Sequence, residues 1–197
     1  MALRVYISSD YSEEHGDREV VDEINRFASD HRYSLDFVDM ARVVSGSVSN
    51  DPNCRPCDLK AEFNRQISAS SAVIFIVGDK TALRVAGKSC TKNPFNHPNC
   101  TPYKQNANGS KLCKLFSIPY DNNNICVVNS KSYLQHEFEQ AVKCSKKILI
   151  FYNSKYKMQN WLPAYMEDYE YIAQPFWTEN MWGNKVGNYQ YLKQELL

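Results

Sequence analysis

The sequence has no long hydrophobic run and no cluster of basic residues. No stretch approaches the ~18 consecutive apolar residues of a membrane-spanning helix, and residues 1–7 lack the basic start and apolar centre of a signal peptide. The formal net charge is only +1, without a run of Lys and Arg that could follow a nucleic-acid backbone. These absences predict a soluble, cytoplasmic protein that binds neither membranes nor nucleic acids.

Glycine-rich nucleotide motifs are also missing. The seven glycines form neither G-x-G-x-x-G nor G-x-x-x-x-G-K-[ST], which argues against a hydride-transferring dehydrogenase and a P-loop nucleotidase. The G-x-S-x-G elbow of α/β-hydrolases is absent, and the four histidines have no evident nucleophile partner. A serine or cysteine hydrolase triad therefore has little support.

Cysteine is plentiful but does not form a strong metal motif. Seven cysteines, an odd number without a secretory signal, favour reduced thiols over a disulfide framework. The candidate zinc ligands are Cys90, His97, Cys100 and Cys113. They do not form two close pairs and a second C-x-x-C is missing, so reduced thiols are favoured and a structural zinc is the less favoured alternative. We expect no other resident cofactor. The Cys54-Arg-Pro-Cys57 segment is either a redox pair or two more reduced thiols.

Alternating apolar segments predict an α/β fold. Strands are expected at Leu3–Ser8, Leu35–Met40, Ala72–Gly78 and Ile148–Tyr152. Apolar residues at helical spacing predict intervening helices: one around Val20–Phe27 with Asp17 on the wet side, one capped by Asp58, and one capped by Ser132. The order predicts a flavodoxin-like parallel sheet with flanking helices, in which the uninterrupted apolar run at 72–78 is central.

A single domain spanning residues 1–197 accommodates these elements. The segment at about 82–131, rich in Asn, Lys, Pro and Cys, is too long for an ordinary α/β connection and is interpreted as an insertion. Within it, Ile125–Val128 is a candidate short strand. Residues from about 153 to 197 are interpreted as an aromatic C-terminal extension of irregular structure, with a short helix from about Tyr189.

The helix expected after Ser132 carries the best candidate for chemistry. Ser132 and Gln135 form a capping-box pattern, which fixes the register of the helix. The apolar face then holds Leu134, Phe138, Ala141 and Val142, while His136 and Glu139 lie further toward solvent. Glu137 lies at the edge of this face, where a carboxylate can reach a cleft. A solvated glutamate with its stem on the core edge has the same spacing.

Polar residues follow the predicted strands, where open parallel sheets bind ligands. The candidate substrate-binding residues at these ends are Ser8, Ser9, Asp10, Tyr11, Asp39 and Thr81. The first four precede a helix, where hydroxyl and backbone N–H groups can hold phosphate or ribose. Helix capping is the commoner use of such residues, and Asp39 could merely end its strand.

Three segments in order resemble the TIR-like domains of bacteria, notably those of Thoeris anti-phage defence. They are Arg4–Tyr11, Ala72–Thr81 with its Val-Gly-x-x-Thr ending, and Tyr133–Ile150 with Glu-Phe-Glu-x-Ala. The resemblance implies that Glu137 is catalytic and that Tyr133 takes the aromatic position one turn earlier. The sequence departs from the usual pattern by placing some fifty residues between the second and third segments.

The resemblance also implies an activity: cleavage of the nicotinamide–ribose bond of NAD, which here would be substrate. The product would be an ADP-ribose-derived signalling nucleotide, linear, cyclic or conjugated, that a downstream effector senses. TIR domains commonly act as assemblies, which implies a homo-oligomer with the Ala41–Pro56 loop as a candidate contact. The alternatives are a non-catalytic TIR scaffold and an N-glycosidase that resembles nucleoside deoxyribosyltransferases.

Overall fold

The computed structural model describes residues 3–9, 17–29, 35–39, 56–85, 87, 104–105, 111–112, 130–154 and 161–197. Its centre is a five-stranded sheet in the order β2-β1-β3-β6-β7, and every neighbouring pair is parallel. The strands are β1 (Leu3–Ser8), β2 (Leu35–Asp39), β3 (Ala72–Val77), β6 (Lys147–Tyr152) and β7 (Ala173–Pro175). This α/β architecture is consistent with a flavodoxin-like fold, whose strand order it shares.

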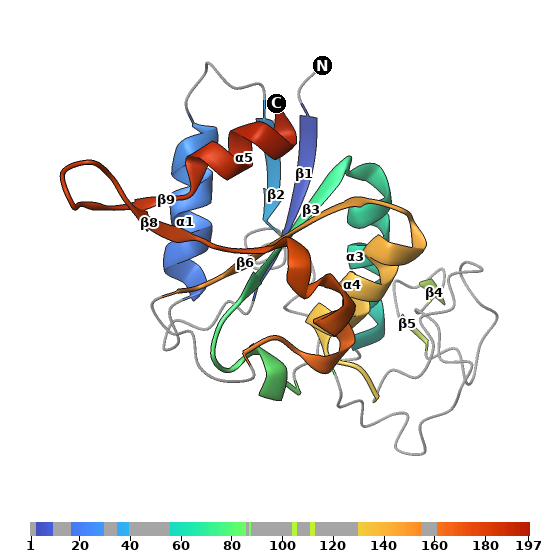
Figure 1. Cartoon of the computed structure of the whole chain (residues 1–197). Helices are drawn as coiled ribbons and strands as arrows, with labels where there is room; N and C mark the ends of the chain where they lie inside the picture. The colour runs from blue at the N-terminus through green and yellow to red at the C-terminus, as the bar shows by residue number, and fades with distance from the viewer. Residues whose placement is uncertain are drawn as a thin grey trace.

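Helices cover both faces of the sheet (Figure 1). The α-helices are α1 (Asp17–Ala28), α3 (Pro56–Ala69), α4 (Tyr133–Lys143) and α5 (Tyr189–Leu196), and the 3₁₀ segments are η1 (Thr81–Leu83) and η3 (Ala164–Ile172). Two small antiparallel pairs complete the described elements: β4 (Lys104–Gln105) with β5 (Lys111–Leu112), and β8 (Trp177–Glu179) with β9 (Lys185–Gly187).

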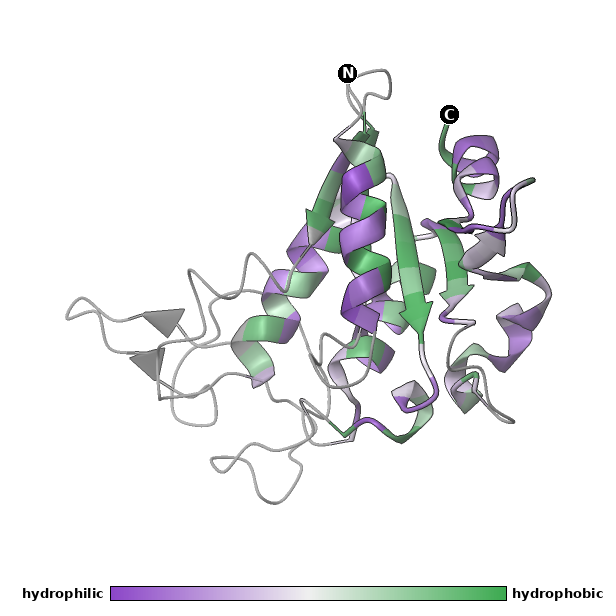
Figure 2. Ribbon diagram, turned by 90° about the vertical axis from the view of Figure 1, so that its left-hand side faces the viewer, coloured by the Kyte–Doolittle hydropathy of each residue, from purple (hydrophilic) through white to green (hydrophobic). Residues whose placement is uncertain are grey.

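The alternation of side chains along each strand divides the core into two clusters. Val5 and Ile7 pack with α1 and α5 on one face of the sheet, whereas Tyr6 packs with α3, α4 and η3 on the other. All six residues of β3 are buried, as predicted for the central strand, and the hydrophobic colour of the strands is visible in Figure 2. The two faces therefore present different helices to the same strand ends.

The segment at 161–197 is more regular than predicted. The helix expected from about Tyr189 is confirmed as α5, but the expectation of irregular structure before it was wrong. Phe176 is fully buried and packs edge-on against Phe151 of β6, with 5.5 Å between ring centroids. Because β7 pairs with β6 and Phe176 fills the core, this segment is part of the sheet domain.

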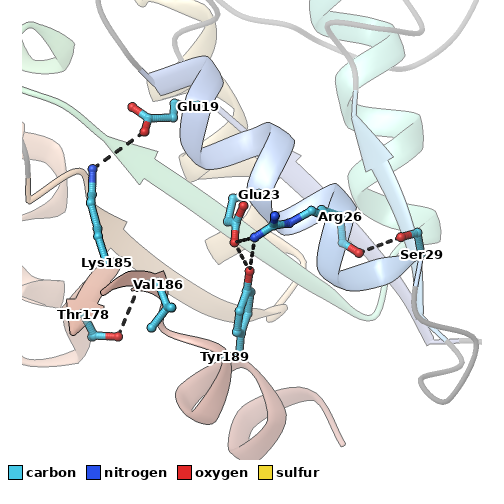
Figure 3. A network of polar contacts seen from close by, with 8 residues as sticks. All are labelled: Glu19, Glu23, Arg26, Ser29, Thr178, Lys185, Val186 and Tyr189. Atoms are coloured by element: carbon cyan, nitrogen blue, oxygen red, sulfur yellow. Dashed lines mark hydrogen bonds and ion pairs between the residues drawn. The ribbon is translucent and has the colours of Figure 1, made fainter. Parts of the chain in front are cut away.

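Contacts with α1 hold the C-terminal hairpin and α5 in place (Figure 3). The Tyr189 ring stacks on Phe27 at a centroid distance of 4.9 Å, and its hydroxyl donates a hydrogen bond to Glu23. Lys185 Nζ lies 3.7 Å from Glu19 Oε1. The aromatic stack contributes more than the exposed ion pair, because surface pairs are worth at most about 1 kcal/mol.

Three expectations at helix ends and faces were wrong. The helix predicted to be capped by Asp58 begins at Pro56, a residue favoured in the first turn. Asp17 is buried instead of lying on the wet side of α1, and Val142 is 40 % exposed instead of sharing the apolar face of α4. Within the described residues, no helix has the length and apolar character needed to cross a membrane.

Candidate functional site

The sheet changes winding direction between β1 and β3, and this position defines the candidate site. The chain passes from β1 to one neighbour, β2, and then returns to add β3 on the other side of β1. The carboxyl ends of the two strands separate at such a point and leave a crevice for a ligand. Ser8 ends β1 in register with Phe75, and Gly78 follows β3 directly.

Helix α4 begins at this edge of the sheet with a defined cap. Ser132 is the N-cap, and its hydroxyl accepts a hydrogen bond from the Gln135 amide at 3.2 Å, as the sequence predicted. The fully buried Lys60 of α3 donates from Nζ to the Lys131 carbonyl at 2.7 Å. These contacts fix the first turn of α4, and with it the direction of the Glu137 side chain.

Glu137 points into the protein and is only 5 % exposed. The Ser8 hydroxyl donates a hydrogen bond to its Oε2 atom, so α4 meets the end of β1 at this carboxyl. Burial raises the pKa of Glu137 from 4.5 to about 7, while the hydrogen bond from Ser8 and the nearby Tyr6 side chain oppose the rise. A carboxyl with this pKa changes charge near neutral pH, which suits acid–base or electrostatic work.

His136 is buried as well, contrary to the expectation that it lies toward solvent. Its Nε2 atom is 2.8 Å from Oδ1 of Asn64 on α3. Burial, together with the positive charge of Lys60, lowers the pKa of His136 from 6.5 to about 4. The imidazole is therefore neutral at pH 7 and joins α4 to α3.

Tyr133 lies one helical turn before Glu137. Its ring meets Phe63 edge-on at a centroid distance of 5.4 Å. Gly87 lies against the other part of the ring with φ +85°, and a Cβ atom there would be 2.6 Å from Tyr133. Only glycine fits this backbone conformation and this close approach. The chain that follows η1 thus crosses the aromatic side chain next to Glu137.

A second polar cluster lies beyond the ends of β3 and β6. The carboxylate of Asp17 lies so near Gly78 that a Cβ on the glycine would be 2.5 Å from Oδ1. Asn153 is fully buried, and its Oδ1 accepts a hydrogen bond from Trp177 Nε1 at 3.0 Å. The Thr81 hydroxyl accepts from the Gly78 amide at 2.8 Å and so closes the turn after β3.

An open groove of about 690 Å³ lies on the opposite face of the sheet. It is bounded by α1, Trp177 and Lys185, and its rim carries charges of both signs. The Glu19–Lys185 and Glu23–Arg26 pairs neutralise much of that charge. Glu137 belongs to the other face, so the groove and the candidate site are separate features.

The structure brings together only some of the predicted site residues. Ser8 and Glu137 are in contact, Tyr133 lies one turn away, and Thr81 shapes the turn after β3. Ser9 is half-buried, and Asp39 is the last residue of β2. Several candidates lie outside the described residues: Asp10, Tyr11, Cys90, His97, Cys100 and Cys113. In the described part of the chain, no three His, Cys, Asp or Glu side chains are grouped to hold a metal ion.

Sequence reasoning missed Asn153 and Asp17, which the fold buries beside the strand ends. Asn153 directly follows a predicted strand, and that position was a usable signal. The fold and the site together define a parallel α/β domain with a buried carboxyl at the switch point of its sheet. No known protein-family profile matches the chain, and no curated protein is significantly similar to it in sequence.

Proposed function

We propose that this chain is a TIR-type enzyme that cleaves the nicotinamide–ribose bond of NAD. The observation that supports it most is the hydrogen bond between Ser8 and Glu137. These residues belong to the first and third of the segments that resemble TIR-like domains, and they meet at the sheet edge where nucleotide ligands bind in such folds. The burial and raised pKa of Glu137 support a chemical role over a solvated one.

The proposed reaction needs only one carboxylate. The nicotinamide ring of NAD carries a positive charge, so the C1′–N bond can break with its electron pair passing to the departing nitrogen. Positive charge then develops on the ribose ring, and the Glu137 carboxylate stabilises it. Water attacking C1′ gives ADP-ribose and releases a proton, whereas attack by a nitrogen or oxygen nucleophile of the substrate or of another molecule gives a cyclic or conjugated product.

The charge of Glu137 sets the expected pH dependence. The ionised form stabilises the transition state, so kcat/KM should rise as the pH increases through the pKa of about 7. At pH 7 roughly half of the molecules are in the ionised form. The hydrogen bond from Ser8 and the nearby Tyr6 side chain favour this form and keep the pKa from rising further.

The proposal extends to a biological role that follows from the resemblance. The ADP-ribose-derived product would act as a signal that a separate effector senses during anti-phage defence. Assembly of several copies would complete or activate the site. Purified protein is therefore assayed at high concentration, with and without lysate from phage-infected cells as activator.

The test measures nicotinamide release from NAD by the wild type, Glu137→Gln and Glu139→Gln, with products resolved by mass. Glu139 is the matched control because it lies two residues away on α4 and forms an ion pair with Lys131 at the surface. We expect Glu137→Gln to lose at least ~100-fold in turnover, as when a principal electrostatic stabiliser is removed. Glu139→Gln should retain wild-type turnover.

The outcomes separate the proposal from its rivals. Retained turnover in Glu137→Gln would overturn the assignment of the catalytic residue. No release from NAD under any condition, but cleavage of a deoxynucleoside, would favour the deoxyribosyltransferase-like reaction. Inactivity toward both substrates would favour a scaffold, which acts through its surface.

A further inference from the structure

The hydroxyl of Tyr165 is buried without a hydrogen bond. Its Oη atom has no hydrogen-bond partner in the described part of the chain. The Ser132 hydroxyl is close enough to influence its pKa but does not complete a hydrogen bond with it. Leaving a buried hydroxyl unpaired destabilises the folded state, so most native structures avoid it. Such a group at a candidate site is expected to pair with a ligand.

Tyr165 is held against α4 by its packing. It lies on η3, which is anchored by the fully buried Met166. The Tyr165 ring contacts Phe138, the residue after Glu137, with 5.9 Å between centroids. Tyr169, four residues later on η3, meets the same Phe138 ring edge-on at 5.1 Å. The two tyrosines thus share a packing partner, but of these two only Tyr165 has a buried hydroxyl without a hydrogen-bond partner among the described residues.

The electrostatic surroundings keep the Tyr165 hydroxyl protonated. Burial raises its pKa, Ser132 opposes this effect, and the negative charges of Glu137 and Glu139 raise the pKa further. The charge of Glu137 therefore acts on the Tyr165 hydroxyl. At neutral pH the group is therefore a hydrogen-bond donor next to an acid, with its donor capacity unused.

We propose that the Tyr165 hydroxyl is a substrate-binding group, which donates a hydrogen bond to a hydroxyl oxygen of the ribose that carries the scissile bond. This inference rests on the proposed function and adds a residue from the 161–197 segment, for which the resemblance offers no counterpart. The ribose hydroxyl supplies the partner that Oη lacks, and Glu137 acts on the adjacent C1′. A site of this kind discriminates strongly against a substrate without that hydroxyl.

The experiment compares wild type, Tyr165→Phe and the control Tyr169→Phe. Each is assayed for kcat and KM with NAD and with NAD analogues that lack the 2′- or 3′-hydroxyl of the nicotinamide ribose. Tyr165→Phe should lose about 10- to 100-fold in kcat/KM on NAD, and much less on one of the two analogues. Tyr169→Phe should stay within about twofold of wild type on every substrate.

Thermal denaturation distinguishes this role from a structural one. Removing an unpaired buried hydroxyl should leave the melting temperature of Tyr165→Phe unchanged or raise it. A melting temperature several degrees lower than that of wild type would show that the hydroxyl stabilises the fold. Equal losses of kcat/KM on NAD and on both analogues would show that the hydroxyl does not bind the ribose. Either result overturns the inference. If wild type turns over NAD and Tyr165→Phe matches it, the inference fails alone. If the wild-type protein does not cleave NAD, both the proposed function and this inference are wrong.

Discussion

The two neighbours Glu137 and His136 should make the free energy of unfolding depend on pH in opposite directions. The pKa of Glu137 is raised from 4.5 to about 7, so between these values the folded protein keeps a proton that the unfolded chain has released. The stabilisation is complete below pH 4.5 and is lost as the pH rises through 7. At about 1.4 kcal/mol per pKa unit, the loss amounts to about 3 kcal/mol.

His136 has the reverse effect. Its pKa is lowered from 6.5 to about 4, so between these pH values the unfolded chain binds a proton that the folded protein does not bind. The stabilisation from the neutral imidazole is present above pH 6.5 and is lost as the pH falls through 4, again by about 3 kcal/mol. The two windows overlap between pH 4.5 and 6.5, and there the contributions of the two residues largely cancel.

The substitution Glu137→Gln removes one of these opposing contributions. A glutamine amide has nearly the shape of the neutral carboxyl, so the variant should equal wild type near pH 4 and exceed it by about 3 kcal/mol above pH 8. Urea denaturation across pH 4–8.5 measures this difference directly. For a protein of this size, 3 kcal/mol corresponds to a rise in melting temperature of about 6–12 °C.

The control is Glu139→Gln, whose side chain is 39 % exposed and paired with Lys131. Its stability relative to wild type should change by less than about 1 kcal/mol over the same pH range. If Glu137→Gln also follows wild type at every pH, then the carboxyl is solvated in the folded state, and the argument from burial is refuted.

Other substitutions test the site and the fold. Ser8→Ala removes a hydrogen bond that lowers the pKa of Glu137, so the midpoint of the rise of kcat/KM with pH should move above pH 7. An unchanged midpoint would contradict this prediction. Gly78→Ala places a methyl group against the carboxylate at the start of α1 and should lose about 1–3 kcal/mol in urea denaturation, whereas wild-type stability would refute the close approach. Phe176→Ala should lower the free energy of unfolding by about 3–5 kcal/mol, whereas the control Met181→Ala, at an exposed residue, should lower it by less than about 0.5 kcal/mol. Equal effects of the two substitutions would show that Phe176 does not belong to the core.

The central elements of the fold could be predicted because their local sequence encodes them. The apolar run at Ala72–Val77 gave the central strand, and the Ser132 cap gave the start of α4. Strand β7 could not be predicted in this way. Its three residues include Pro175 and show no alternation, so it exists through its pairing with β6 at the sheet edge.

The sequence-based description of Glu137 was incomplete in its environment. Helical spacing placed it at the edge of an apolar face, a position from which Glu137→Gln would leave stability unchanged. Because Glu137 is only 5 % exposed, Glu137→Gln is instead expected to change the free energy of unfolding by an amount that depends on pH. Spacing also failed for His136, because α3 covers the side of α4 that a lone helix would expose. Tyr165 is out of reach of local reasoning, because η3 meets α4 only in the folded chain.

The pairing of β3 with β6 has a consequence for how the chain is made. Ala72 is in register with Lys147, 75 positions later, whereas Leu3 pairs with Leu35, 32 positions later. The longer closure adds only about 0.7 kcal/mol of loop entropy. A ribosome that adds about 5–20 residues per second nevertheless takes about 4–15 s to reach the partner strand. Throughout that interval the all-apolar β3 has an unpaired edge, which exposes this central strand to aggregation during synthesis.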